Sequence, residues 1–277
     1  MKFFGYTVVY NEETLVPYVL PYILQMGYDK YVIYDDGCTD NTIPLLISGL
    51  TTAGVAYEVR PTIVNNKDYD FDGRKRDSQL DAINECKRII AETQESVWMT
   101  FTDFDEVIYC SRERQRYFKE YLEMEDDRGY NFFSGRMLNL IWDGKEKDDT
   151  LLPHQWDGVR GAWWLSEGMK VTLIKVNDFA NFMVYCANHY LGVRMEKEKT
   201  PKDLSGCGEF HGFHLKYFDK NSFVSKTARH YGQDPQAYLK RVKACSFPMD
   251  MYFLLKGLVS ERLSPNKRDP GEGLFLF

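Results

Sequence analysis

Residues 3–36 read FFGYTVVYNEETLVPYVLPYILQMGYDKYVIYDD and carry the clearest indication of the fold. Its apolar start predicts a buried strand over Phe3–Val9, and apolar positions at helical spacing predict a helix over Glu12–Met26. Gly27 follows at the position that favours a left-handed helix cap, and Lys30–Tyr34 predicts a second strand. A strand, a helix and another strand in this order are typical of a parallel sheet with crossover helices.

The same alternation continues through the first hundred residues. It predicts a strand over Val55–Arg60, a polar, charged loop over Asn65–Arg76, a helix over Asp77–Gln94 and a strand over Val97–Thr102. The second half is less regular, with strands predicted over 130–134, 169–176 and 182–186 and helices over 222–231, 236–245 and 249–259. We therefore expect an α/β fold, with a mixed, mostly parallel sheet flanked by helices in one domain.

Composition and charge exclude several classes of protein. Lys and Arg number 35 against 41 Asp and Glu, and the net charge of −6 argues against a nucleic-acid binder with a broad basic face. No run of about 18 apolar residues is present, so no membrane span is expected, although a peripheral contact with a membrane is compatible with the sequence. The six cysteines form no CxxC pair and the N-terminus does not resemble a signal peptide, so we expect reduced thiols and a cytoplasmic location.

The strongest local motif is TFTDFDEVIY, residues 100–109, in which an apolar strand leads into two carboxylates. The two-residue period of a strand places Asp103 and Asp105 on one side, with Phe104 turned to the core. Their mutual repulsion is relieved by a hard divalent cation, and oxygen ligands suit Mg²⁺ or Mn²⁺. The alternative is a solvated acidic turn.

A second motif, YDDGCTDNT at residues 34–42, again ends a strand in two carboxylates, Asp35 and Asp36. A carboxylate there can accept the N–H of a nucleobase or a ribose hydroxyl, although the same residues also make good turn and cap chemistry. In VVYNEE, residues 8–13, Tyr10 ends the first strand and either stacks on a base or covers the end of the sheet. In GRKRDSQ, residues 73–79, three cations precede a predicted helix start, which suits a diphosphate or is simply a solvated charge run.

The strand ends and the basic segment are expected to converge on one crevice, because the carboxyl ends of parallel strands meet at one sheet edge. In this order the motifs resemble family 2-type glycosyltransferases, which begin with Y-N-E, continue with D-D-G-S-T-D and carry D-x-D near residue 100. The FTDFDE segment is especially similar to the subgroup that overlaps glycosyltransferase family 92. The resemblance covers Phe3–Tyr109 and implies the GT-A fold, a Rossmann-like nucleotide-diphospho-sugar transferase fold, with a nucleotide-binding half (1–110), an acceptor-side half (111–220) and C-terminal helices (221–277).

The resemblance also implies roles for individual residues of the nucleotide site. Tyr10 stacks on the nucleobase, with Asn11 and Glu12 beside it in the same site. Asp36 accepts the base N–H, which favours uracil, and Arg76 lies near the base or the diphosphate. A UDP-sugar is therefore the expected donor.

For the metal, the resemblance implies that Asp105 is a direct ligand of Mn²⁺ or Mg²⁺, with Asp103 at the metal or the ribose. A histidine late in the chain completes the metal shell in many GT-A enzymes. We expect His214 in that role ahead of His189 and His211. The alternative is an ordinary hydrogen-bonded histidine of the core or surface.

The catalytic base is expected in the second half of the chain, because an inverting transfer needs a group that takes the proton of the acceptor hydroxyl. Glu167 ranks first, Asp157 second and Glu209 third, by their position relative to Trp156 and a Trp-Trp pair at 163–164. Tryptophan faces pack on sugars, so an acceptor saccharide is expected there, with a hydrophobic core as the alternative.

Taken together, the sequence predicts a metal-dependent, inverting glycosyltransferase that acts on a nucleotide-sugar donor and a saccharide or other hydroxyl acceptor. A metal-dependent phosphohydrolase that uses the same carboxylates is a rival prediction, but it leaves Tyr10 and Asp36 unexplained. A GT-A domain that binds sugar or nucleotide without catalysis is the other rival, and the intact acid pair argues against it.

Overall fold

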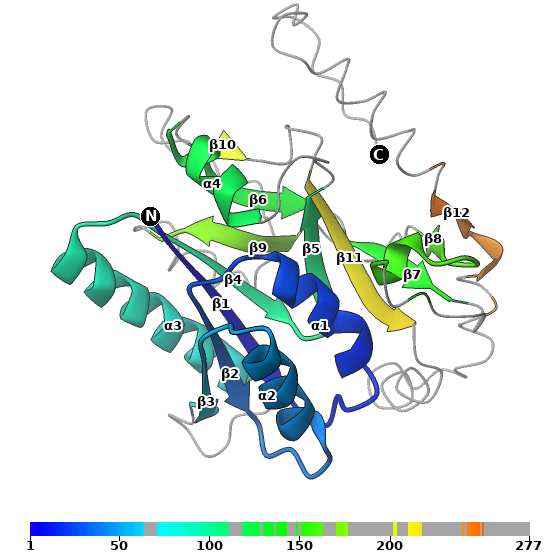
Figure 1. The fold of residues 1–277 in the computed structure, drawn as a ribbon, viewed down its shortest axis with the longest axis horizontal. Helices are drawn as coiled ribbons and strands as arrows, with labels where there is room; N and C mark the ends of the chain where they lie inside the picture. Colours follow the sequence, from blue (N-terminus) through cyan, green and yellow to red (C-terminus); the bar gives the residue numbers. More distant parts are fainter. Residues whose placement is uncertain are drawn as a thin grey trace, which may run out of the picture.

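A sheet of seven strands, in the order β10-β6-β9-β4-β1-β2-β3, forms the centre of the described part of the chain (Figure 1). The computed structural model describes residues 1–63, 71–110, 118–127, 130–135, 137–142, 148, 151–162, 170–176, 202–203, 210–217, 240, 243–249 and 251. The strands of this sheet are β1 (Lys2–Val9), β2 (Lys30–Asp35), β3 (Tyr57–Pro61), β4 (Val97–Asp103), β6 (Tyr130–Gly135), β9 (Lys170–Lys175) and β10 (Lys202–Asp203). β4, β1, β2 and β3 pair in parallel, and β9 runs antiparallel between β4 and β6. The fold class predicted from the sequence, α/β with a mixed, mostly parallel sheet, is confirmed.

Helices cover both faces of the parallel strands, because successive side chains of a strand point to opposite sides. They are α1 (Val16–Gln25), α2 (Thr42–Thr52), α3 (Phe71–Thr93) and α4 (Phe118–Asp127). On β2, Ile33 packs with α1 and α2, whereas Val32 and Tyr34 pack on the other face with Ile83 and Cys86 of α3. The alternation of β2 therefore separates two layers of the core.

A second sheet, in the order β12-β8-β7-β11-β5, lies beside the first. Its strands are β5 (Glu106–Cys110), β7 (Leu138–Ile141), β8 (Arg160–Ala162), β11 (Phe210–Tyr217) and β12 (Phe247–Pro248), with a short 3₁₀ helix η1 (Pro153–Gln155) between β7 and β8. The chain passes from the first sheet to the second in the turn at Phe104–Asp105, which joins β4 to β5. The same core cluster contains side chains of α1 and of β5, β7 and β11, so the two sheets share one core.

The sequence-based boundaries differ from the structure mainly at α3 and in the second half. α3 begins at Phe71, six residues before the predicted start at Asp77, so the predicted loop over 65–76 is in part helical. The second sheet was not predicted. The strand predicted over 182–186 and the helix predicted over 222–231 lie outside the described residues, as do most residues of 236–245 and 249–259.

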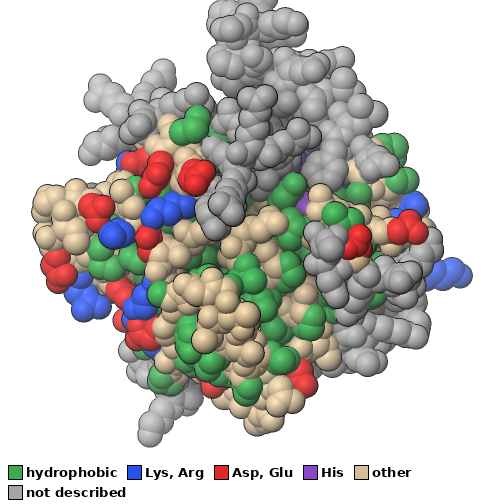
Figure 2. Space-filling model, in the orientation of Figure 1, with side chains coloured by type: hydrophobic (Ala, Val, Ile, Leu, Met, Phe, Trp, Pro, Cys, Tyr) green, Lys and Arg blue, Asp and Glu red, His purple; other side chains and the backbone are tan. Residues whose placement is uncertain are grey.

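The surface of the described part mixes charges of both signs. On the face seen in Figure 2, Lys and Arg side chains are interspersed with Asp and Glu side chains. Within the described residues, no helix combines the length and the apolar character that a membrane crossing requires.

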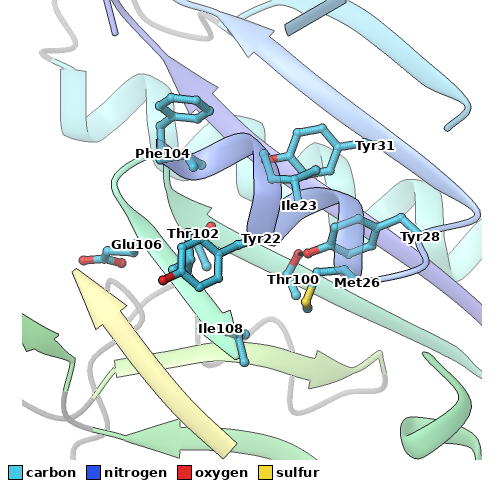
Figure 3. A pocket seen from close by; sticks show the side chains of 12 residues that line it. Tyr22, Ile23, Met26, Tyr28, Tyr31, Thr100, Thr102, Phe104, Glu106 and Ile108 are labelled. Carbon is cyan, nitrogen blue, oxygen red and sulfur yellow. Dashed lines mark hydrogen bonds between the residues drawn. The ribbon is translucent and has the colours of Figure 1, made fainter. Parts of the chain in front are cut away.

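A small cavity lies between α1, β4 and β5 (Figure 3), and it is lined by Tyr22, Tyr28, Thr100, Thr102 and Glu106 together with apolar side chains. Its volume is about 20 Å³, which holds about one water molecule. This cavity is therefore too small for a nucleotide or a sugar.

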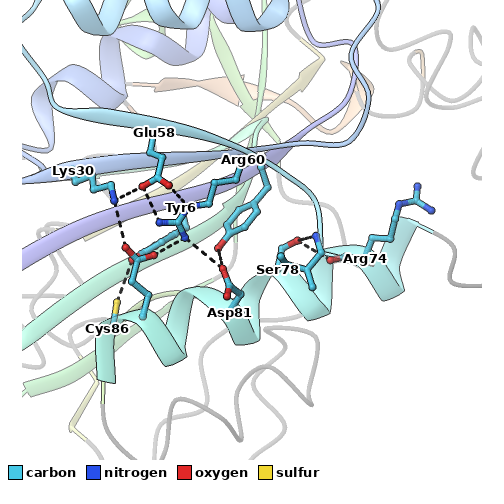
Figure 4. Close-up of polar contacts among 11 residues, drawn as sticks. Tyr6, Lys30, Glu58, Arg60, Arg74, Ser78, Asp81 and Cys86 are labelled. Atoms are coloured by element: carbon cyan, nitrogen blue, oxygen red, sulfur yellow. Dashed lines mark hydrogen bonds and ion pairs between the residues drawn. The ribbon is translucent and has the colours of Figure 1, made fainter. Parts of the chain in front are cut away.

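An ion-pair network fixes α3 against the outer strands (Figure 4). Arg60 of β3 donates to Glu58 (Nε to Oε1, 2.6 Å) and to Glu85 of α3 (Nη1 to Oε2, 2.7 Å), and Lys30 of β2 pairs with both carboxylates. The hydrogen bonds from Arg60 lower the pKa of Glu58 to about 2. The Tyr34 hydroxyl donates to Asp81 of α3 at 2.8 Å. These contacts set the position of α3, whose first turns face the carboxyl edge of the sheet.

His154 of η1 is buried in the shared core as a neutral imidazole. The Tyr22 hydroxyl accepts from the His154 backbone N–H at 3.1 Å and forms a second hydrogen bond with Nδ1 of the same residue at 2.9 Å. The ring also packs against Tyr109 and Phe213, with centroids 4.3 and 4.9 Å away. Burial lowers the pKa of His154 to about 3.

This burial predicts a specific acid sensitivity. The unfolded chain protonates His154 near pH 6.5 and the folded chain only near its lowered pKa of about 3, so protonation favours the unfolded state as the pH falls through this range. Between pH 6.5 and 5, the free energy of unfolding of the wild type should fall more steeply than that of His154→Gln, by up to about 1.4 kcal/mol per pH unit. Urea titrations over this range measure both slopes, and equal slopes would contradict the prediction.

Candidate functional site

The ends of β1, β2 and β4 lie side by side at one edge of the sheet. In the parallel pairing, Val8 of β1 is opposite Asp103 of β4, and Val9 is opposite Asp35 of β2. Tyr10, Asp36 and Phe104 are therefore the next residues along three adjacent strands. Ligands of open α/β sheets bind at this edge, so the sequence-predicted residues converge where a site is expected.

Two loops at this edge are fastened to each other. The Asn11 side chain, on a backbone with φ 54°, accepts from the Thr39 backbone N–H at 2.8 Å, and asparagine tolerates this left-handed conformation better than most residues. The Glu12 backbone N–H donates to Thr42 Oγ1 at 2.7 Å. These contacts join the β1–α1 loop to the β2–α2 loop, and they hold Tyr10 at the rim with 40% of its surface exposed.

The adjacent carboxylates Asp35 and Asp36 have different partners. Asp35 Oδ1 accepts from the backbone N–H groups of Gly37 (3.0 Å) and Cys38 (2.7 Å) and so closes the turn, where Gly37 has φ 88°. The Asp36 side chain is only 5% exposed. It accepts from Thr62 Oγ1 at 2.8 Å and from both Nε and Nη2 of Arg74, at 2.7 and 2.8 Å. A carboxylate has about four acceptor positions, so these bonds leave acceptor capacity on Oδ2.

The basic segment lies within α3 and not before its N-terminus, which corrects the prediction of a phosphate site built on free helix N–H groups. Arg74 and Lys75 act instead through their side chains, each toward a strand-end carboxylate. Arg76, which the resemblance places near the base or diphosphate, has an exposed side chain. Two residues correspond to a rotation of about 200° around a helix, so Arg74 and Arg76 point in different directions. The arginine that reaches Asp36 is Arg74, a contact that the sequence did not predict.

The D-x-D carboxylates also have separate partners. Asp103 forms an ion pair with Lys75 of α3. Asp105, in the turn that follows β4, lies with Oδ2 at 3.3 Å from Nε2 of His214 on β11, and both side chains are about nine-tenths buried. The Asp105 backbone oxygen accepts from the Leu215 N–H at 2.7 Å, which fixes the turn against β11. Phe104 between them is buried in the core, as predicted.

The Asp105 and His214 pair is compatible with a divalent cation. Among the residues that the structure describes, no three His, Cys, Asp or Glu side chains are grouped closely enough to hold a metal by themselves. Mg²⁺ at phosphate-transferring sites is commonly bound by one or two carboxylates together with substrate phosphates, so three protein ligands are not required. A carboxylate and an imidazole nitrogen are also suitable donors for Mn²⁺.

The residues expected at the acceptor side are only partly described. Glu167, Glu209 and His189 lie outside the described residues, and so do Trp163 and Trp164. Asp157 is exposed in the turn after η1.

Two of the described aromatic and histidine candidates belong to the core. Trp156, expected as part of a sugar platform, is instead buried against Tyr18 and Trp142, with ring centroids 5.9 and 5.3 Å away. It is fixed because its Nε1 donates to the Asp148 carbonyl at 2.8 Å. His211 is buried and stacks on Tyr109.

Comparison with known proteins gives structural likenesses alone. No family model matches the chain, and no curated protein matches it. Among solved structures it is similar to S. aureus TarS, at 15% identity and a TM-score of 0.33 over 55% of this chain and 24% of that one. It is also similar to S. aureus TarS 1–349 in complex with UDP (14% identity, TM-score 0.36, 69% of this chain and 50% of that one). The match to TarS 1–349 in complex with UDP-GlcNAc has 14% identity and a TM-score of 0.34, over 69% of this chain and 49% of that one. The chain thus spans about half the length of the TarS 1–349 structures that it matches.

The two backbone N–H groups that Asp35 binds predict that its side chain stabilises the turn after β2. Asp35→Ala removes the acceptor of the Gly37 and Cys38 N–H groups and should lower the free energy of unfolding by about 1 to 2 kcal/mol. Urea unfolding measures the loss. Glu92→Ala, on an exposed face of α3, is the control and should change stability by less than about 0.5 kcal/mol. Equal values for the two variants would show that Asp35 does not stabilise the turn.

Proposed function

We propose that the chain is a glycosyltransferase that moves a sugar from a UDP-sugar to a hydroxyl acceptor. The observation that carries the proposal is the pairing of Asp36 with Arg74 beside the exposed ring of Tyr10, at the carboxyl edge of the parallel strands. An acceptor, a donor and a flat aromatic surface at one sheet edge are the elements that a nucleobase site requires.

The chemistry of uracil matches these groups. Its N3–H lies between two carbonyl oxygens, so recognition needs one acceptor with a donor next to it. Asp36 has acceptor capacity left on Oδ2, and the Arg74 guanidinium alongside supplies donors for a carbonyl oxygen. Cytosine has no N3–H, so this pair favours uracil. Tyr10 stacks on the base, with Asn11 and Glu12 shaping the loop below it.

Asp105 and His214 would hold a divalent cation, and Asp103, the last residue of β4, lies two residues earlier in the chain. A cation bound there would supply Lewis-acid stabilisation of the departing diphosphate. The side chain of Lys75 adds positive charge at the same place, where negative charge develops during transfer. The lysine side chain and the carboxylate-bound cation would thereby both stabilise the negative charge of the departing diphosphate.

The reaction proposed is inverting, and a carboxylate is the base that takes the proton of the acceptor hydroxyl. Glu167 is the first candidate and Asp157, which is exposed and open to an acceptor, is the second. The closeness to the subgroup overlapping family 92 and the cytoplasmic location are part of the same proposal and rest on the sequence motifs and cysteine usage.

A metal-dependent phosphohydrolase remains the second candidate, because Asp105 and His214 suit a hydrolytic metal as well. The Asp36–Arg74 pair disfavours a phosphohydrolase, since hydrolysis of a simple phosphate ester requires no side chains that hydrogen-bond to a nucleobase. A domain that binds nucleotide sugars without catalysis is the third candidate.

Incubation with a panel of UDP-sugars and Mn²⁺ separates the three functions. Release of UDP that depends on donor and acceptor is the expected result, whereas hydrolysis of simple phosphate esters marks a phosphatase and binding without turnover marks a binding module. Asp105→Asn should abolish turnover and metal-dependent donor binding while the thermal unfolding temperature stays near that of the wild type. The control is Glu95→Gln, an exposed carboxylate before the opposite end of β4, and it should remain fully active.

Base recognition has its own test. Asp36→Asn replaces a charged acceptor by a group that also donates, so the binding free energy of UDP should weaken by about 1 to 2 kcal/mol. Calorimetry with UDP and CDP measures the change, and the preference for UDP over CDP should shrink in the variant. Unchanged affinity and preference would show that Asp36 only positions Arg74.

A further inference from the structure

Thr62 is the first residue after β3, and its half-buried side chain reaches the carboxylate of the proposed base site. Its Oγ1 donates to Asp36 Oδ1 at 2.8 Å, and its backbone N–H donates to the Asp35 carbonyl at 3.1 Å. Thr62 is therefore bound to the end of β2 through both its side chain and its backbone. None of the motifs found in the sequence contains this residue.

The segment that carries Thr62 is also fixed to α3. The next residue, Ile63, donates its backbone N–H to Ser78 Oγ of α3 at 3.1 Å, and the Ser78 hydroxyl donates to the Arg74 carbonyl at 2.9 Å. Ser78 and Arg74 lie one turn apart on the helix (Figure 4). Thr62 is thus held between the two parts of the base site, which are the carboxylate after β2 and the helical turn that carries Arg74.

The hydrogen bonds of Asp36 are divided unequally between its two carboxylate oxygens. Oδ1 accepts from Thr62 Oγ1 at 2.8 Å and from Arg74 Nε at 2.7 Å. Among the residues that the structure describes, Oδ2 accepts from Arg74 Nη2 alone, at 2.8 Å. Each oxygen of a carboxylate accepts about two hydrogen bonds, so Oδ1 is filled and Oδ2 keeps one position.

We propose that Thr62 is a positioning residue of the base site, which fills Oδ1 of Asp36 and so directs the open position of Oδ2 toward the N3–H of uracil. This role rests on the proposed function, because Thr62 acts on the base through Asp36. One open acceptor beside the donors of Arg74 matches a base edge in which a single N–H lies next to a carbonyl oxygen.

The Thr62 hydroxyl also determines which base the site rejects. Without it, Arg74 alone holds the carboxylate of Asp36, and Oδ1 gains an open acceptor position. The amino group of cytosine is a donor, and it then finds an acceptor that the wild type does not offer. Loss of the hydroxyl is therefore expected to weaken the binding of UDP but not that of CDP.

The test is calorimetry of UDP and of CDP binding to the full chain in the presence of Mn²⁺. Thr62→Val keeps the branched shape and removes the hydroxyl, so the preference for UDP over CDP should fall by about fivefold, the factor that corresponds to one hydrogen bond. Thr62→Ala is a second variant without the hydroxyl and should show the same fall. Thr62→Ser restores the donor and should keep the wild-type preference.

The matched control is Thr51→Val, which removes the hydroxyl of an exposed threonine of α2 that donates to Tyr57 Oη at 3.3 Å. It should leave both affinities unchanged. The effect of Thr62 must also depend on Asp36. In an Asp36→Asn background, Thr62→Val should therefore change the preference no further.

Two results overturn the inference while the base site itself stands. One is a preference for UDP that Thr62→Val and Thr62→Ala leave at the wild-type level, and the other is an equal loss of affinity for UDP and CDP, which marks a structural role alone. A wild type that does not prefer UDP over CDP contradicts the proposed base site, and the role of Thr62 fails with it. The three results are distinguishable because the wild type is titrated with both nucleotides first.

Discussion

The parallel pairing of β1 with both β2 and β4 is the constraint on which the site depends. Each pairing is in a register that ends the three strands at the same level, with Val8 opposite Asp103 and Val9 opposite Asp35. A shift by one residue would turn every side chain of a strand to the other face and remove its apolar side chains from the core. Burial of the strands therefore fixes the position of the polar residues that follow them.

The second constraint is the attachment of α3, which brings cations to the acidic edge. Lys30 of β2 and Arg60 of β3 pair with Glu85 of α3, and Arg60 is itself held by Glu58 of β3. The first turns of the helix extend from there toward the strand ends. Arg74 meets Asp36 through two hydrogen bonds from a planar guanidinium, a geometry that lysine does not reproduce. The edge is thus an arrangement of paired charges and not an acidic patch.

The first hundred residues were predictable because their signals are local. The apolar runs of β1, β2 and β4 and the helical spacing of α1 appear directly in the sequence, and parallel strand ends must meet, so the convergence of Tyr10, Asp36 and Asp103 followed. The start of α3 did not follow, since charged residues carry no apolar period, and the contact of Arg74 with Asp36 was therefore not predicted.

The second sheet and its contacts were less predictable because they are non-local. β11 pairs with β5 about a hundred residues earlier in the chain, and no sequence spacing encodes that pairing. His214 was selected from a resemblance alone, and its contact with Asp105 required the structure. Trp156 lies in the core, which was one of the two alternatives, because a tryptophan on a sugar and a tryptophan in a core have the same sequence context.

The bond between Asn11 and Thr39 links two loops that are far apart in sequence and are both in contact with the proposed base site. A second bond of the same kind joins Glu13 to the backbone N–H of Asn41 at 3.1 Å. The β1–α1 loop and the β2–α2 loop therefore form one structural unit. Grafting either loop alone from another protein would break these hydrogen bonds, whereas transplanting both loops together would preserve them. The two loops are therefore also expected to have changed together during evolution.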